Sequence, residues 1–291
     1  MSGPTAQPRI LFVTSEIVFI PTRNEEYSHF VCPHIGGFSD SLGELISGLY
    51  NLGVDVYVAQ PYYRKVFADL CQIIHQAGLR GIPEGRVCLT RDRAFYYANC
   101  PHDNLRAENT RISLAFQREV INHVIREVQP DLLHCHDWMT GLIPAIAKIL
   151  RIPCLFTVQN PENAQTILSD IEDIGIDAAE FWQHLFYDRY PINYEETRES
   201  NSIDLLLSGI FSANFINTSS SAFVLNMAEN QNSFAKLHFW EQLVKKMSAG
   251  CAAINSTLSQ TQQYIDIYES MLHRSIFQPK QRNAEFKAAA S

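Results

Sequence analysis

Two histidines and an aspartate stand in the pattern His134-Cys135-His136-Asp137, at the end of a short apolar run. Alternate residues of a strand face the same side, so the imidazoles of His134 and His136 could share a metal ion. A metal-dependent hydrolase would need at least one more ligand and an activated water, and no third position is compelling. The plainer interpretation makes one histidine a core residue and Asp137 a helix N-cap. Both interpretations stay open on the residues alone.

A glycine pair, Gly36-Gly37, comes directly before a helical apolar pattern that includes Asp40. Glycines let a backbone approach a ligand closely, and a helix N-terminus attracts phosphate. The same pair could be a simple turn. Two more segments, residues 156–160 and 206–220, combine a predicted strand with polar residues and are uninformative by themselves.

Alternating strands and helices are predicted to position these segments. A continuous β-branched run predicts a buried strand over residues 9–15, and apolar spacing predicts a helix over residues 38–52. The next elements are strands at 54–59, 132–135 and 154–158, with helices at 113–128 and 142–150. This order predicts the α/β class, with a single doubly wound, mostly parallel sheet. Ligands of such sheets bind at the carboxyl ends of the strands, where the candidate residues fall.

The remaining segments give weaker patterns. We expect a hairpin near residues 95–97, a helical stretch over 170–190, a helix over 203–211, a strand over 214–219 and helices within 234–272. The apolar side chains of residues 264, 267, 268, 271 and 272 form one stripe, which predicts a helix docked on the first domain. The predicted division is a Rossmann-like domain over 1–230, a C-terminal helical segment over 231–277 and a tail over 278–291.

Composition narrows the function classes. The 291 residues carry a net charge of −8 with no Lys/Arg-rich run, so nucleic acid is not an expected partner. The seven cysteines are odd in number and form no Cys-x-x-Cys pair, which predicts neither disulfides nor a zinc knuckle and favours a reducing cytoplasm. No long apolar stretch follows the first strand, so we expect no secretory signal and no membrane association.

Taken in order, the segments resemble those of the glycogen/starch synthases, which have the GT-B fold. That family opens with a strand ending in Ser-Glu, here Ser15-Glu16, and a Lys-Thr-Gly-Gly-Leu-x-Asp loop, here residues 34–40. Its other markers match residues 134–142, 157–160 and 207–220. The resemblance implies glucosyl transfer from a nucleotide-glucose to an α-1,4-glucan. It places substrate-binding residues at Gly36, Gly37, Asp40, Asp137 and Asn160, with no metal and no cofactor, and leaves the catalytic residues unassigned.

The departures from that pattern weaken the expectation of catalysis. The family's phosphate-contacting lysine is His34 here, its histidine near the reacting sugar is Gln159, and a further histidine is Met139. No second set of β-α units follows residue 227, where the family has its nucleotide-binding domain. We therefore expect no activity from the isolated chain. The alternative is a non-catalytic glucan-binding or regulatory protein. Its expected ligand is an α-glucan or a nucleotide-sugar, with a second copy or partner subunit covering the open cleft face.

Overall fold

The computed structural model describes residues 7–21, 29–33, 37–73, 81–98, 106–159, 162–218 and 260–273. Its centre is a six-stranded sheet with the order β11-β8-β7-β1-β4-β6. Every pairing in this sheet is parallel, which confirms the predicted α/β class. The strands are β1 (Arg9–Val13), β4 (Asp55–Pro61), β6 (Val87–Thr90), β7 (Leu132–His136), β8 (Cys154–Val158) and β11 (Phe215–Thr218).

The central strands are buried on both faces. All five residues of β7 and all five of β8 are buried, in the register Leu133 opposite Cys154 and His136 opposite Thr157. Strands covered by helices on both sides read as continuous apolar runs, which is why these segments could be found in the sequence.

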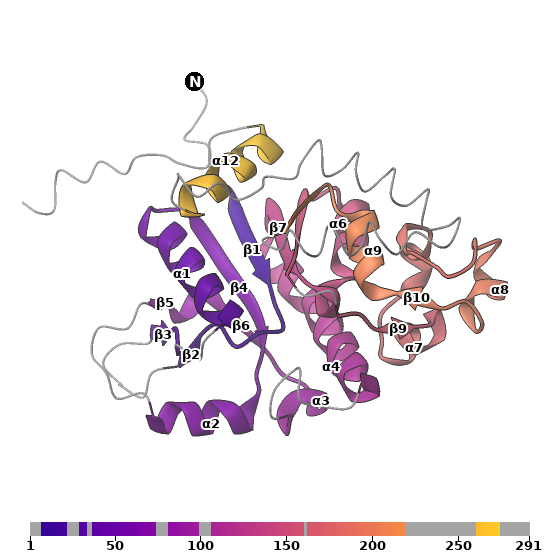
Figure 1. Ribbon diagram of the computed structural model, residues 1–291, viewed down its shortest axis with the longest axis horizontal. Helices are drawn as coiled ribbons and strands as arrows, with labels where there is room; N and C mark the ends of the chain where they lie inside the picture. Colours follow the sequence, from indigo (N-terminus) through magenta and orange to yellow (C-terminus); the bar gives the residue numbers. More distant parts are fainter. Residues whose placement is uncertain are drawn as a thin grey trace, which may run out of the picture.

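Helices α1 (Gly37–Asn51) and α12 (Gln260–Leu272) cover one face of the sheet, and Figure 1 shows both on that side. The buried cluster between them and the sheet includes Phe12 of β1, Leu45 of α1 and Tyr268 of α12. The docked helix predicted from the apolar stripe at residues 264–272 is therefore present as α12 and packs against α1. The expected helices before residue 260, the tail at 278–291 and the first domain boundary at 230 lie outside the described residues.

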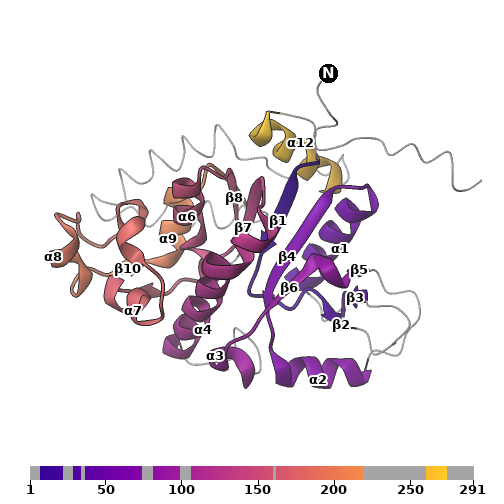
Figure 2. The same cartoon turned by 180° about the vertical axis from the view of Figure 1, so that it is seen from behind.

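The opposite face is covered by α4, α6 and α9, which Figure 2 shows on the side of the sheet away from α1. α4 (Arg106–Glu119) continues through one π-helical turn, Val120–Val124, into α5 (Ile125–Val128), so the predicted helix begins seven residues earlier than expected. α6 (Ile143–Leu150) and α9 (Leu205–Ser212) pack against each other.

A smaller antiparallel sheet and two helices flank β4 and β6. The sheet joins β2 (Ile20–Pro21), β3 (His29–Val31) and β5 (Gly81–Pro83), which leads through the 3-10 turn Glu84–Arg86 into β6. Helix α2 (Arg64–Ile73) follows β4. The hairpin expected near residues 95–97 is wrong: α3 (Arg93–Tyr96) forms there, because the Asp92 carboxylate caps it by accepting a hydrogen bond from the backbone N–H of Ala94.

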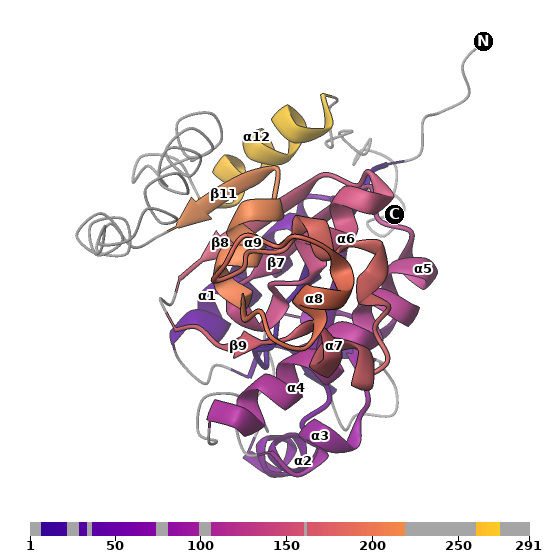
Figure 3. The same ribbon diagram turned by 90° about the vertical axis from the view of Figure 1, so that its right-hand side faces the viewer.

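Residues 162–204 form a short-element region, which faces the viewer in Figure 3. The helical stretch expected over 170–190 is wrong beyond Asp173. Gly175, with φ 96°, ends α7 there, and its backbone N–H donates to the carbonyl of Glu172. Two residues of the helix expected at 203–211 pair as a strand instead. The elements are β9 (Gln165–Thr166), α7 (Leu168–Asp173), 3-10 turns Ala178–Glu180 and Trp182–His184, α8 (Tyr194–Arg198) and β10 (Ile203–Asp204).

Among the described residues, no helix combines the length and apolar character needed to cross a membrane.

Candidate functional site

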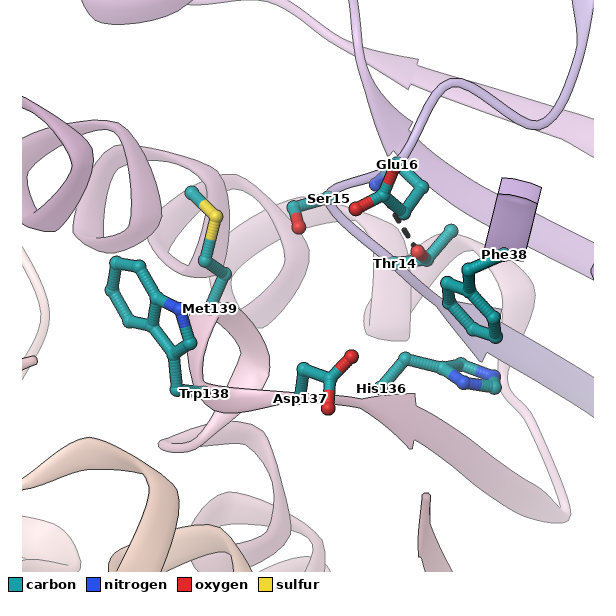
Figure 4. Close-up of a pocket in the computed structure, with 8 residues that line it drawn as sticks. All are labelled: Thr14, Ser15, Glu16, Phe38, His136, Asp137, Trp138 and Met139. Atoms are coloured by element: carbon teal, nitrogen blue, oxygen red, sulfur yellow. Dashed lines mark hydrogen bonds between the residues drawn. The ribbon is translucent and has the colours of Figure 1, made fainter. Parts of the chain in front are cut away.

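The carboxyl ends of β1 and β7 and the first turn of α1 enclose a small pocket (Figure 4). Its cavity measures about 10 Å³, which is about the room that one water molecule or one hydroxyl group needs. Carboxylates, hydroxyls, an imidazole and large apolar groups meet there. The lining residues are Thr14, Ser15, Glu16, Phe38, His136, Asp137, Trp138 and Met139.

Asp137 has a strained backbone immediately after β7. Its φ of 57° and ψ of 179° lie in a backbone region that residues other than glycine rarely adopt. Holding a residue there costs about 1–3 kcal/mol of conformational strain. Its side chain makes no capping bond to the 3-10 turn Trp138–Thr140, so the N-cap interpretation is wrong. The carboxylate instead accepts a 2.7 Å hydrogen bond from the backbone N–H of Gln159, at the end of β8. Asp137 thus joins two neighbouring strand ends.

The loop after β1 is tied to the start of α1 through Glu16. The backbone N–H of Glu16 donates to the Thr14 hydroxyl at 3.1 Å, and the Glu16 carboxylate accepts from the Ser39 hydroxyl at 3.0 Å. A carboxylate in this place also interacts favourably with the N-terminal end of α1. Neither Glu16 nor Ser39 is among the site residues predicted from the sequence. The signal for Glu16 was its position directly after a buried strand.

His134 is a fully bonded core residue. Its Nδ1 lies 2.7 Å from the Tyr268 hydroxyl, and its Nε2 lies 2.7 Å from the Thr157 hydroxyl. Burial, and next the neighbouring His136, hold the pKa of His134 well below its ordinary value, so the ring is neutral. Thr157 donates its one proton to Asn217 and therefore accepts from His134 Nε2–H, which leaves Nδ1 to accept from Tyr268.

The metal-site hypothesis gains no support from this arrangement. Both ring nitrogens of His134 are occupied by hydroxyl groups. Within the part of the chain that the structure describes, no group of three histidine, cysteine, aspartate or glutamate side chains could hold a metal ion.

His136 is bonded quite differently from His134, although the two ring centroids are only 4.2 Å apart. The side chain is 2% exposed, and neither Nδ1 nor Nε2 has a hydrogen-bond partner among the described residues. Its ring packs against Phe38 of α1, with 5.3 Å between centroids. Burial lowers the pKa of His136 to about 3, so this imidazole is also neutral near pH 7.

The segment after Asp137 is fixed against α4 and α9. The Ser113 hydroxyl donates to the carbonyl of Met139, and the backbone N–H of Leu142 donates to the Gln117 side chain. A Cβ added at Gly141 would lie 1.9 Å from the carbonyl oxygen of Leu205, which is impossible without moving α9. The glycine of this motif is therefore required for packing.

The structure brings part of the predicted site together. Asp137 and Gln159 are bonded to each other, and Gly37 and Asp40 lie in the first turn of α1, which contributes Phe38 to the same pocket. Gly36 and Asn160 lie outside the described residues. That Gly36, Gly37, Asp40, Asp137 or Asn160 binds a substrate stays a prediction.

Comparison with known proteins identifies the family. The family model of the starch synthase catalytic domain matches residues 9–238. The chain belongs to this family. Curated relatives include the glycogen synthases of Desulforamulus reducens, 25% identical over 222 residues, and Anoxybacillus flavithermus, 26% identical over 213 residues. These matches cover 65% and 62% of this chain, but only 43% and 41% of the relatives, so the chain spans less than half of their length.

A solved structure supports the fold. The catalytic domain of starch synthase IV from Arabidopsis thaliana, bound to ADP and acarbose, matches with a TM-score of 0.55 and 16% identity. The match covers 83% of this chain and 50% of that one. This likeness supports a Rossmann-like sheet of the GT-B type for the chain.

Proposed function

We propose that this chain forms the α-1,4-glucan-binding side of a glucosyl-transfer site and transfers no glucose by itself. The observation that carries the proposal is Asp137, a strained residue in a pocket at the carboxyl edge of the sheet. Strain of this kind persists where the surrounding structure enforces it and clusters at ligand sites. The family gives the substrate class.

The chemistry of the pocket suits a sugar. Asp137 and Glu16 supply carboxylate oxygens, which accept hydrogen bonds from sugar hydroxyls, and Thr14 and Ser15 supply hydroxyls of their own. A cavity the size of one hydroxyl group would take a single hydroxyl of the glucan, with the sugar ring outside it.

Three positions support the loss of catalysis in the isolated chain. Transfer requires developing charge on the diphosphate to be stabilised, and the resemblance assigns a lysine and a histidine to the positions of His34 and Gln159. A glutamine side chain carries no charge at any pH. Met139, at the position of a second family histidine, is 1% exposed and offers only a weak acceptor. Loss of one such donor typically costs roughly 2.7–4 kcal/mol of transition-state stabilisation.

The proposal includes a second unit that holds the nucleotide. In the family, a second domain carries most of the nucleotide-binding groups. We propose that a partner subunit or a second copy of this chain covers the carboxyl edge of the sheet. A regulatory role in a complex of that kind remains the alternative to transfer.

The test combines binding and transfer with the purified chain. Calorimetry with maltoheptaose should give saturable binding, and labelled ADP-glucose or UDP-glucose should give no incorporation into glycogen above a protein-free blank. Asp137→Asn can keep the hydrogen bond from Gln159 but loses the charge, so it should weaken maltoheptaose binding roughly tenfold with little change in Tm.

Asp173→Asn, an equal charge change at the exposed end of α7, is the matched control and should bind like the wild type. Absence of saturable maltoheptaose binding would overturn the glucan-binding proposal. Incorporation of label by the unmodified chain would overturn the proposed lack of transfer.

A further inference from the structure

His136 is a buried polar side chain that the fold leaves unsatisfied. The residue is 2% exposed, and both ring nitrogens lack a hydrogen-bond partner in the described ranges. Buried donors and acceptors are almost always paired in native structures, because an unpaired one loses its hydration without compensation. A group of this kind requires an explanation other than stability.

Packing alone does not explain the imidazole. The ring of His136 lies against Phe38 at 5.3 Å and parallel to Phe12 at 6.3 Å, measured between centroids. A phenyl ring would make the same contacts without burying two polar nitrogens. His134, two residues earlier on the same strand, shows the contrast, because hydroxyl groups bond both of its nitrogens.

The position of His136 suggests what its nitrogens bind. The residue lines the pocket at the end of β7 together with Asp137 and Glu16, and the cavity has room for about one hydroxyl. The two carboxylates can only accept hydrogen bonds when ionised, whereas a neutral imidazole has one donor and one acceptor. A hydroxyl group also donates and accepts, so the imidazole complements it in either direction.

We propose that His136 hydrogen-bonds one hydroxyl of a bound α-glucan and so positions the sugar beside Asp137. This inference rests on the proposed glucan binding. Phe38 lies over the ring in Figure 4 and is half-buried, so binding involves a small displacement of that side chain. His136 is retained, on this view, at a cost in stability that binding offsets.

Replacing histidine by phenylalanine at position 136 and, separately, at position 134 distinguishes a ligand-binding role of His136 from a structural one. His136→Phe keeps the aromatic packing and removes the unsatisfied nitrogens, so its Tm should equal or exceed that of the wild type. It should also bind maltoheptaose roughly tenfold more weakly, because the ligand hydroxyl loses its partner. His134→Phe, the matched control, should lower Tm, since Tyr268 and Thr157 lose their bonded partner.

A second measurement uses the unmodified chain. The ring ¹⁵N signals of His136 should shift when maltoheptaose is added to saturation, whereas those of His134 should stay in place. Unshifted His136 signals, a Tm drop in His136→Phe like that in His134→Phe, or unchanged affinity in His136→Phe would each overturn the inference. If the wild type binds maltoheptaose and only the His136 measurements give these contrary results, the proposed glucan binding stands. If the wild type does not bind maltoheptaose, both proposals fail.

Discussion

His134 and His136 show how two identical side chains on one strand can differ in role. Both face the α1 and α12 side of the sheet, as the alternation along a strand predicts. His134 meets α12 and is bonded on both nitrogens, whereas His136 meets the first turn of α1 and lines the pocket. The sequence predicted that they share a face. It could not predict their partners, because Thr157 and Tyr268 lie 23 and 134 positions from His134 along the chain and reach it only in the folded sheet.

Both histidines should make stability depend on pH. The pKa of each is below the ordinary 6.5 in the folded chain, so the unfolded chain binds more protons below pH 6.5. The free energy of unfolding should be at its full value above pH 6.5. It should fall as pH drops from 6.5 toward 4, by at most about 1.4 kcal/mol per pH unit for each histidine. Urea unfolding at pH 7.5, 6 and 5 measures this slope.

His136→Phe provides the comparison for that measurement. It removes one of the two buried histidines, so the slope between pH 6.5 and 5 should fall clearly; His134 and the partly buried His184, whose pKa burial also lowers, supply the remainder. Asp92 and Glu172, whose pKa values are also lowered in the folded chain, contribute mainly below that interval. Equal slopes in the variant and the wild type would show that His136 is not neutralised by burial.

The individual residues of the candidate site were only partly predictable from the sequence. Asp137 and Gly37 could be placed at the carboxyl edge because each lies at a strand end or a helix start. The sequence could not predict the left-handed backbone of Asp137 or the hydrogen bond from Ser39 to Glu16. Both depend on how β1, β7 and α1 meet.

Helix α12 is held to the sheet by a directed chain of hydrogen bonds as well as by apolar packing. Tyr268 donates to His134, His134 to Thr157, Thr157 to Asn217, and Asn217 to the hydroxyl of Tyr264 at 3.1 Å. The chain begins and ends on α12 and passes through β7, β8 and β11. All five side chains are buried, so each bond that is lost leaves a polar atom without water.

Tyr268→Phe should therefore lower the free energy of unfolding by about 1–3 kcal/mol, because Nδ1 of His134 becomes a buried acceptor without a donor. Urea denaturation at pH 7.5 measures the change. Ser270→Ala, at an exposed position of the same helix, should change stability by no more than about 0.5 kcal/mol. A Tyr268→Phe variant as stable as Ser270→Ala would mean that the hydrogen bond between Tyr268 and His134 does not help to hold α12.

The elements that the sequence predicted well are those with long or fully buried patterns. β7, β8 and α1 were found because their apolar residues follow a strand or helix period. Local capping decided the failures: Asp92 starts α3 where a hairpin was expected, and Gly175 ends α7 early. In the first case one capping side chain, and in the second one glycine, determined the local structure against a weak apolar pattern.

At the scale of the whole molecule, the alternation of elements was sufficient to predict the fold. Six parallel strands with helices on both faces follow from the β-α order, because parallel neighbours need crossover connections. The carboxyl edge then collects the ends of β1, β7 and β8 and the start of α1, so the site's location follows from topology.

Restoring family side chains should not create a working enzyme from this chain alone. The double variant His34→Lys and Gln159→His replaces the two departures that bear on charge stabilisation. The hydrogen bond from residue 159 to the Asp137 carboxylate uses a backbone N–H, so it should be kept in the Gln159→His variant. Transfer still requires the nucleotide to be held in line with the glucan, and orientation alone can account for roughly 7–11 kcal/mol of a barrier.

The measurement is incorporation of labelled glucose from ADP-glucose into glycogen, with the wild type and a protein-free blank run in parallel. We expect the double variant to stay at the level of the blank. Addition of a separately purified nucleotide-binding half of a glycogen synthase should raise incorporation if the two surfaces fit, and more with the double variant than with the wild type. Incorporation by the double variant alone would mean that these two side chains, and not a second nucleotide-holding unit, were what transfer lacked.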